Sequence, residues 1–281
     1  MHIENPKLDE AKNPNVSHVS ATFEISQLLI QLAGWVLILL LLARSFAWAL
    51  GNYLPYSYEQ KYLSSIGSAM LEDTQDDVKL QTLADQLKAH VHLPEGAHIQ
   101  VHTNPAKEVN AFATFGGHVV LMQGLLEKAP TEQALSMLLA HEMAHVAHRD
   151  PLKAVSQGAM LQVLRSAIFG EQVAVDGGLM LSMLSYSRDQ ETAADEAALD
   201  AVYAHYGSIN GAVEMFDFLA NENQADARRN KLSNWLPQWL STHPDTSQRQ
   251  AHLRAYAQQK GYSTQGQTLP NPWLKTAIPQ P

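Results

Sequence analysis

The amino-acid sequence predicts a mostly helical α+β protein with a small antiparallel sheet and one N-terminal transmembrane helix. Three observations lead to this prediction: a long uncharged run near the N-terminus, alternating polar and apolar residues around a glycine pair, and a helical pattern from about residue 131 to residue 257. They divide the chain into four parts: an N-terminal tail (1–24), a transmembrane anchor (25–50), a folded domain (51–257) and a C-terminal tail (258–281).

The composition excludes several classes of function. The chain has 281 residues, of which 46% are hydrophobic, so it can bury a complete core. Its formal net charge is −9 and its longest basic run is Arg228-Arg229, so we expect no nucleic-acid partner. The chain has no cysteine, which excludes disulfides, thiolate metal ligands and a cysteine nucleophile. A bound metal would therefore be held by His, Asp or Glu side chains.

The uncharged run ISQLLIQLAGWVLILLLLA, residues 25–43, is predicted to be a single-pass anchor in the lipid bilayer. As a helix it would span about 28 Å, close to the roughly 30 Å hydrocarbon core of a membrane. A cleaved signal peptide is the alternative, because Ala47-Trp48-Ala49 has the small-x-small form of a cleavage site. The positive charges on the two sides of the run are tied, so they leave the orientation open.

The next segments form the first half of the folded domain. Residues 51–60 contain Gly, Pro and Asn and are predicted to be a joint after the anchor. Acidic residues then precede an apolar 3.6-residue pattern within residues 72–91, which predicts a helix. Residues 98–103 alternate between polar and apolar side chains, which predicts a strand with one solvent-exposed face. Residues 108–123 predict a β-hairpin around a glycine pair.

Two hydrophobic stretches, residues 159–169 and 173–184, are too short to span a membrane, and charged residues interrupt this region. They are predicted to be core helices or a hydrophobic flank near the bilayer. The C-terminal tail is predicted to be either an irregular wrap around the domain or a loosely ordered end.

The segment PTEQALSMLLAHEMAHVAH predicts a helix with Thr131 as its N-cap. His141 and His145 lie four residues apart, so both imidazoles lie on one face of the helix and can bind one Zn²⁺. Glu142 lies beside the open coordination position, where a general base is needed. His148 lies about 10.5 Å along the axis from His141, too far for the same ion, and is predicted to be an outer or surface residue.

A third ligand has to come from another segment, and SRDQETAADEAALD offers Glu191 and, one turn later, Asp195. Carboxylates at this spacing can point at one site, with Glu191 binding the metal and Asp195 accepting the ring N–H of a ligand histidine. Glu196 and Asp200 lie nearby, and spacing alone does not choose among these acids.

Four segments follow one another in the chain: VNAFATFGGHVVLMQGLL, HEMAHVAHRDP, YSRDQETAADEAAL and STHPDTSQR. Together, and in this order, they resemble the membrane-associated gluzincin metallopeptidases related to HtpX, the CaaX prenyl endopeptidases and BepA. The resemblance implies a zincin-type fold and one zinc ion bound by His141, His145 and Glu191, with Asp195 as their outer partner. The chain departs from HtpX-like members, which have several membrane helices, and it shows none of the helical repeats of BepA-like members.

The resemblance also implies zinc-dependent endopeptidase activity on protein or peptide substrates, with Glu142 as the general base. His243 and Arg249 are the implied second electrophiles for the transition state. The outer strand of the hairpin would pair with the substrate backbone. The implied substrate-binding residues are Asn110, which otherwise closes a turn, and His118, Val119 and Val120.

These features predict a bacterial inner-membrane protein with one membrane pass, a periplasmic catalytic domain and a role in membrane or envelope protein quality control. The sequence permits a homo-oligomer. One alternative is a membrane-anchored chaperone-like or binding module, but binding alone does not need Glu142. Another is hydrolysis of a non-peptide amide, against which the hairpin argues because it suits extended peptides.

Overall fold

The computed structural model describes residues 20–69, 71, 73–156, 185–229, 243 and 246–274. The chain forms two compact units, residues 1–45 and 46–281. The predicted elements at 159–169 and 173–184, and most of the N-terminal tail, lie outside the described residues. Within the described residues the predicted fold class is confirmed: the chain is mostly helical, with a small sheet and one apolar N-terminal helix.

Helix α1, Ala21–Tyr53, contains the predicted anchor. Among the described helices it alone has the length and composition to cross a membrane, and its most apolar window contains no buried residue. The helix continues three residues past the predicted anchor and ends just before Pro55, which restricts the residue before it to extended conformations. Its last turns, from Phe46 on, belong to the second unit.

A four-stranded sheet forms one layer of the second unit. Its strands, in spatial order, are β1 (Gln75–Asp76), β2 (Gln100–Asn104), β4 (His118–Met122) and β3 (Ala111–Thr114). β3 and β4 form the predicted antiparallel hairpin around the short helix η2 (Phe115–Gly117). Gly117 has φ 85°, and a Cβ there would lie 1.9 Å from the carbonyl oxygen of His98, so the turn requires glycine.

One strand pairing differs from the sequence prediction. β2 and β4 are parallel, with Val101 beside Val119, so the sheet is mixed and not purely antiparallel. β4 therefore has a neighbour on each side, and β3 lies at the edge of the described sheet. The prediction that the strand with His118, Val119 and Val120 is the outer strand is wrong, because its backbone already pairs with β2 and β3.

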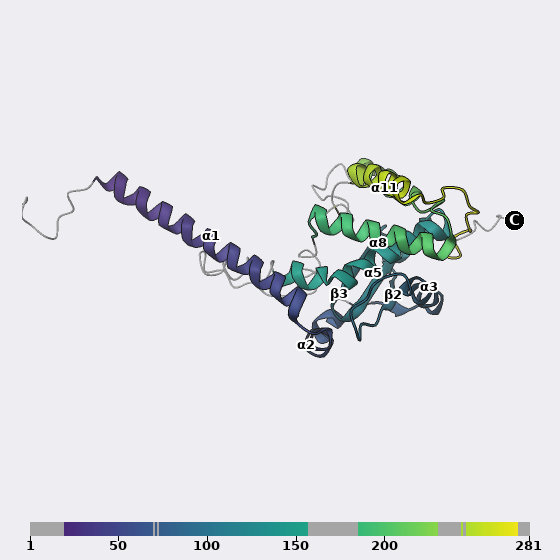
Figure 1. The fold of residues 1–281 in the computed structure, drawn as a ribbon, viewed down its shortest axis with the longest axis horizontal. Coiled ribbons are helices and arrows are strands. Elements are labelled where there is room, and N and C mark those ends of the chain that lie inside the picture. The colour runs from purple at the N-terminus through teal and green to yellow at the C-terminus, as the bar shows by residue number, and fades with distance from the viewer. Residues whose placement is uncertain are drawn as a thin grey trace, which may run out of the picture. The chain divides into compact units, whose positions relative to one another are not determined.

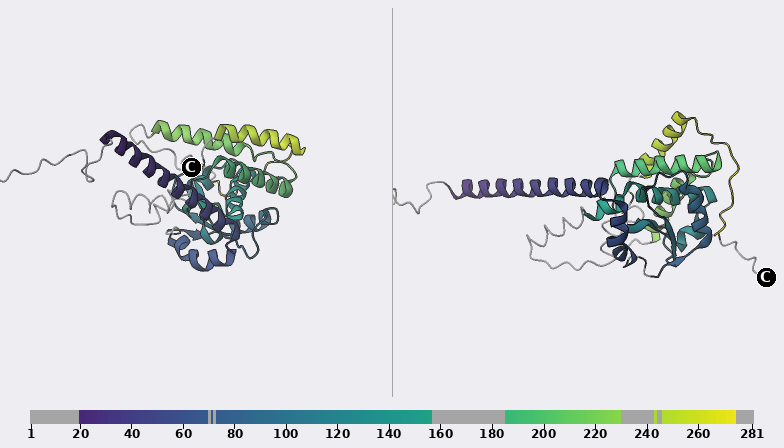
Figure 2. Two further views of the ribbon diagram at one scale, coloured as in Figure 1. Left: turned by 60° about the vertical axis from the view of Figure 1, so that its left-hand side comes forward. Right: turned by 60° about the horizontal axis from the view of Figure 1, so that its bottom comes forward.

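Helices cover the sheet and form most of the core. Those described in the second unit are α2 (Tyr56–Ala69), α3 (Val78–Lys88), α4 (Gln123–Lys128), α5 (Glu132–His148), α8 (Arg188–Tyr206), α9 (Glu214–Arg229) and α11 (Thr246–Lys260). Figure 1 shows α5 between the sheet and α8. The main core joins α3, the sheet, α5 and α8 through buried residues such as Leu80, Leu121, Leu139 and Val202. α11 packs along α8 (Figure 2).

The described part of the C-terminal tail packs along the domain, which is the first of the two predicted alternatives. Asn271 Nδ2 donates to the carbonyl oxygens of Leu126 and Ala129, both at 2.8 Å. It thereby supplies a hydrogen-bond donor to carbonyl groups at the C-terminal end of α4, which have no partner within the helix. Trp273 Nε1 donates to Asp77 Oδ2 at 3.1 Å, next to the start of α3. These bonds attach the described part of the tail to α4 and to the start of α3.

Candidate metal centre

Helix α5 places the centre of the site inside the domain. Its N-cap is Thr131, as predicted, and the Thr131 hydroxyl accepts a backbone N–H of the first turn at 3.1 Å. All residues from 133 to 146 are buried, and His141, Glu142 and His145 are at most 2% exposed. Polar side chains this deep need partners, because an unpaired buried polar group is costly.

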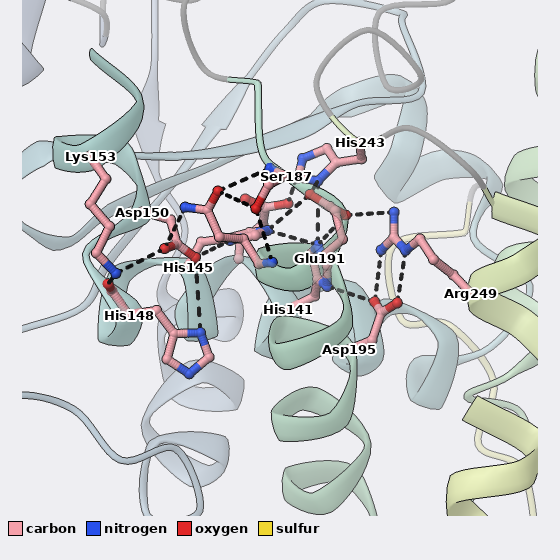
Figure 3. A network of polar contacts seen from close by, with 12 residues as sticks. His141, His145, His148, Asp150, Lys153, Ser187, Glu191, Asp195, His243 and Arg249 are labelled. Carbon is pink, nitrogen blue, oxygen red and sulfur yellow. Dashed lines mark hydrogen bonds and ion pairs between the residues drawn. The ribbon is translucent and has the colours of Figure 1, made fainter. Parts of the chain in front are cut away.

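The two imidazoles of α5 converge with a carboxylate of α8. His141 Nε2 and His145 Nε2 lie 3.0 Å apart, and the Glu191 oxygens lie 3.6 Å from the first and 3.5 Å from the second. Figure 3 shows these side chains pointing at one another. Atoms at such separations can all bind one ion at about 2.0–2.2 Å, the range for zinc. The buried donor set therefore fits a metal ion.

The outer nitrogen of each imidazole faces its own carboxylate. His141 Nδ1 lies 2.9 Å from Asp195 Oδ1, and His145 Nδ1 lies 2.9 Å from Asp150 Oδ2. A carboxylate in this place accepts the Nδ1 proton and directs Nε2 at the centre. The sequence predicts Asp195 in this role, whereas Asp150 emerges only from the structure.

Asp150 reaches His145 because α5 ends in a left-handed turn. Arg149 is the C-cap, with φ 58° and ψ 33°, so α5 ends there in a left-handed turn, and helical structure resumes at Asp150. Gln190 of α8 donates to the other oxygen of Asp150 at 2.8 Å. Burial opposes ionisation of Asp150, but the hydrogen bonds with His145 and Gln190 outweigh it and hold the pKa of Asp150 below its ordinary value.

Glu142 lies beside the converging ligands. Neither of its buried carboxylate oxygens has a hydrogen-bond partner among the described residues, and His243 Nε2 lies 3.5 Å from Oε1. A buried carboxylate in this state is available to accept a proton.

His243 joins the group from a distant part of the chain. Its Nδ1 lies 2.8 Å from Glu191 Oε1 and 3.4 Å from His141 Nε2. Candidate ligand atoms of His141, His145, Glu191 and His243 all lie within 4.8 Å of one another. The structure thus brings His243 together with the three predicted ligands.

Arg249 of α11 contacts the carboxylates of the site. Its Nε and Nη2 donate to Asp195 at 2.8 and 2.7 Å, and its Nη1 lies 2.6 Å from Glu191 Oε2. Burial opposes ionisation of Asp195, but the hydrogen bonds with Arg249 and His141 outweigh it and lower the pKa of Asp195. These contacts favour an orienting role for Arg249 over the predicted role as an electrophile that faces the substrate.

Tyr186 lies at the site and is not among the residues that the sequence predicts there. Its ring stacks on His145, with centroids 4.0 Å apart and planes at 22°. Its buried hydroxyl has no hydrogen-bond partner among the described residues. Burial, followed by the charge of Glu142, raises the pKa of Tyr186 well above its ordinary value, so the hydroxyl stays protonated. In the sequence it stands directly before Ser187, the N-cap of α8, as the first residue of the segment YSRDQETAADEAAL.

Other predicted residues lie outside this group. His148 is 37% exposed at the side chain, and its Nδ1 lies 3.9 Å from Asp150 Oδ2, in keeping with an outer position. The carbonyl of Asn110 accepts the N–H of Met122 at 3.0 Å, so its backbone helps to close the hairpin. His118 Nδ1 lies 3.0 Å from a ring nitrogen of His102. His118 does not belong to the cluster of candidate metal ligands.

The fold and site together define a class: a helical α+β protein in which two packed helices bring together buried His and Glu side chains that fit a metal ion. Residues 74–257, more than half of the chain, match the model of Peptidase family M48. The chain belongs to this family.

Three relatives illustrate the range of the similarity. The chain is 30% identical over 168 residues to the beta-barrel assembly-enhancing protease of Escherichia coli (strain K12), covering 54% of this chain and 33% of that protein. It is 26% identical over 268 residues to the protease HtpX homolog of Gemmatimonas aurantiaca, covering 80% and 90%. It is 26% identical over 176 residues to the mitochondrial metalloendopeptidase OMA1 of Saccharomyces cerevisiae, covering 60% and 47%. The predicted resemblance to HtpX and BepA is confirmed, and the chain spans a third of the E. coli relative.

Proposed function

We propose that this chain is a membrane-anchored, zinc-dependent endopeptidase. The observation that carries the proposal is the convergence of His141, His145 and Glu191 beside the carboxylate of Glu142. Two imidazoles and one carboxylate are a donor set of catalytic zinc sites, which keep a further position open. Membership of a peptidase family supports peptide or protein substrates.

The residues of the site have separate roles in the proposed hydrolysis. His141, His145 and Glu191 would hold the zinc ion, which supplies Lewis acidity to polarise a peptide carbonyl and lower the pKa of water. A carboxylate oxygen of Glu142 takes a proton from the attacking water and then donates it to the nitrogen of the departing amine.

Hydrogen-bond donors are needed where negative charge develops on the carbonyl oxygen. We assign this role to His243 Nε2 and the Tyr186 hydroxyl, whose rings lie with centroids 5.4 Å apart at the site. Arg249 is assigned a positioning role instead, because its guanidinium contacts Asp195 and Glu191.

For the substrate backbone we propose the edge of β3 in place of the strand with His118, Val119 and Val120. β3 has one neighbour in the described sheet and packs against α5. An extended peptide adds to a sheet at such an edge. Asn110 directly precedes β3, and its buried side-chain oxygen, which has no hydrogen-bond partner among the described residues, is suited to accept a substrate N–H.

We propose that α1 anchors the protein as a single pass in a bacterial inner membrane, with the domain of residues 51–257 in the periplasm and a role in envelope protein quality control. The chain has no cysteine, so Glu95→Cys, in an exposed turn, introduces a single thiol. Labelling of this thiol reports the side of the membrane on which the domain lies. Labelling of spheroplasts by a membrane-impermeant maleimide is expected. Labelling only after lysis would place the domain in the cytoplasm.

The proposed activity is tested with the purified full chain in detergent micelles. We expect one bound zinc ion per chain and cleavage of an unfolded protein at internal bonds, identified by mass spectrometry. A chelator should stop cleavage and added zinc should restore it. Zinc binding without cleavage would favour the binding module, and products trimmed only from one end would contradict an endopeptidase.

A further inference from the structure

A buried ion pair connects the end of α5 to α2. Arg149 donates through Nε and Nη2 to Glu59 Oε2 at 3.0 and 2.8 Å, and the two side chains are 8% and 5% exposed. Arg149 Nη1 also donates to the carbonyl oxygen of Leu54. The proposed hydrolysis uses none of these three residues.

The backbone of Arg149 forms the turn that places Asp150. Its φ of 58° and ψ of 33° are left-handed values, which glycine adopts more readily than arginine. The turn brings Asp150 Oδ2 to 2.9 Å from His145 Nδ1. Because Glu59 and Leu54 hold the guanidinium, they offset the strain of this conformation and fix the turn.

The first turns of α2 also reach the hairpin. Glu59 Oε1 accepts the N–H of Gly116 at 3.4 Å, and the ring centroid of Tyr56 lies 5.9 Å from the guanidinium of Arg149. α2 begins at Tyr56, so Leu54 lies in the short link that follows α1. The segment directly after the apolar helix therefore contacts both the end of α5 and the hairpin turn.

We propose that Arg149 and Glu59 are positioning residues for the metal centre and act on His145 through Asp150. This inference rests on the proposed zinc site and adds the segment after α1 to the parts of the chain that set its metal affinity. Removal of one partner leaves the other charge buried and uncompensated. The turn then loosens, Asp150 withdraws from His145, and zinc binding weakens although every ligand is present.

The test measures the zinc affinity of the full chain in micelles by competition with a chelator. The variants are Glu59→Gln and Arg149→Gly, and glycine is informative because it favours the left-handed turn while removing the guanidinium. We expect each to weaken zinc binding on the order of tenfold, as for outer partners of metal ligands. The double variant should be no weaker than the single ones, because the two residues act as one unit.

A matched control is Glu127→Gln, which breaks the more exposed pair with Lys107 and should leave zinc affinity unchanged. With Co²⁺ in place of zinc, the visible absorption bands report ligand geometry, so they should shift in Glu59→Gln and Arg149→Gly but not in the control. Glu59→Asp keeps the negative charge on a shorter side chain and should give a zinc affinity between those of the wild type and Glu59→Gln. If Glu59→Gln does not fold, Glu59→Asp takes its place in the test.

Two results separate the inference from the function on which it rests. Wild-type zinc affinity and a wild-type Co²⁺ spectrum in Arg149→Gly would overturn the positioning role. Failure of the wild-type chain itself to bind zinc would overturn the proposed function instead.

Discussion

The two histidines of α5 depend on different carboxylates. Asp195 lies one turn after Glu191 on α8, and this spacing within one helix allows its role to be predicted from the sequence. Asp150 reaches His145 through a left-handed turn at Arg149, which the sequence does not indicate because arginine seldom adopts that conformation. The outer partner of one ligand was therefore predictable and that of the other was not.

Asp150→Asn tests this outer partner. We expect zinc affinity to fall about 10- to 100-fold, because the amide lacks the negative charge that holds the Nδ1 proton of His145. Chelator competition measures the change. Asp189→Asn, an exposed carboxylate in the first turn of α8, is the control, and equal affinities for the two variants would contradict the role of Asp150.

Tyr186→Phe tests the proposed donor to the carbonyl oxygen. The ring that stacks on His145 remains, so only the hydroxyl is lost. We expect kcat to fall by about tenfold or more with little change in KM, because the bond forms in the transition state. Tyr62→Phe, at an exposed tyrosine, should change neither constant. An unchanged kcat in Tyr186→Phe would remove this residue from the mechanism.

At the scale of elements, local pattern predicts α5 and the hairpin but not the strand order. Thr131 and the apolar spacing mark α5, and a glycine pair joins two strands that are neighbours in sequence. β2 pairs in parallel with β4, although the sequence places β3 between these two strands, so the pairing depends on packing and not on the order of the strands along the chain. The edge strand could therefore be identified only from the structure, as could the contacts of Arg249 on α11.

Asn110→Ala tests the proposed edge of β3. Loss of one hydrogen bond to the substrate backbone should raise KM about 2- to 10-fold with kcat nearly unchanged. A fluorogenic peptide gives both constants. Gln100→Ala, at an exposed polar residue of β2, is the matched control. A KM at the wild-type value would argue against substrate binding at Asn110.

Leu139→Ala tests how far α5 supports the domain. Leu139 is fully buried in the main core, so the free energy of unfolding should fall by about 2–5 kcal/mol. Denaturant titration measures the change. Val78→Ala, at a residue 80% exposed, should change it by less than about 0.5 kcal/mol. A similar small change for Leu139→Ala would contradict the described core.

At the scale of the whole molecule, the family match begins at residue 74, yet the folded domain begins earlier. The last turns of α1 and all of α2 belong to the second unit, and Glu59 of α2 reaches the end of α5. The sequence predicts an anchor followed by a joint at residues 51–60. It does not reveal that this joint contacts the end of α5. Glu59 and its buried partner Arg149 lie 90 residues apart, so their contact leaves no local pattern in the sequence.

Glu142→Gln tests whether Glu142 moves the proton at the proposed zinc centre. The measurement is cleavage of an unfolded protein by the full chain, with bound zinc counted in the same samples. We predict an unchanged zinc content and a rate about 10²- to 10⁴-fold lower, because the amide cannot accept a proton from water. Cleavage by the zinc-loaded variant at the wild-type rate would show that Glu142 is not the general base.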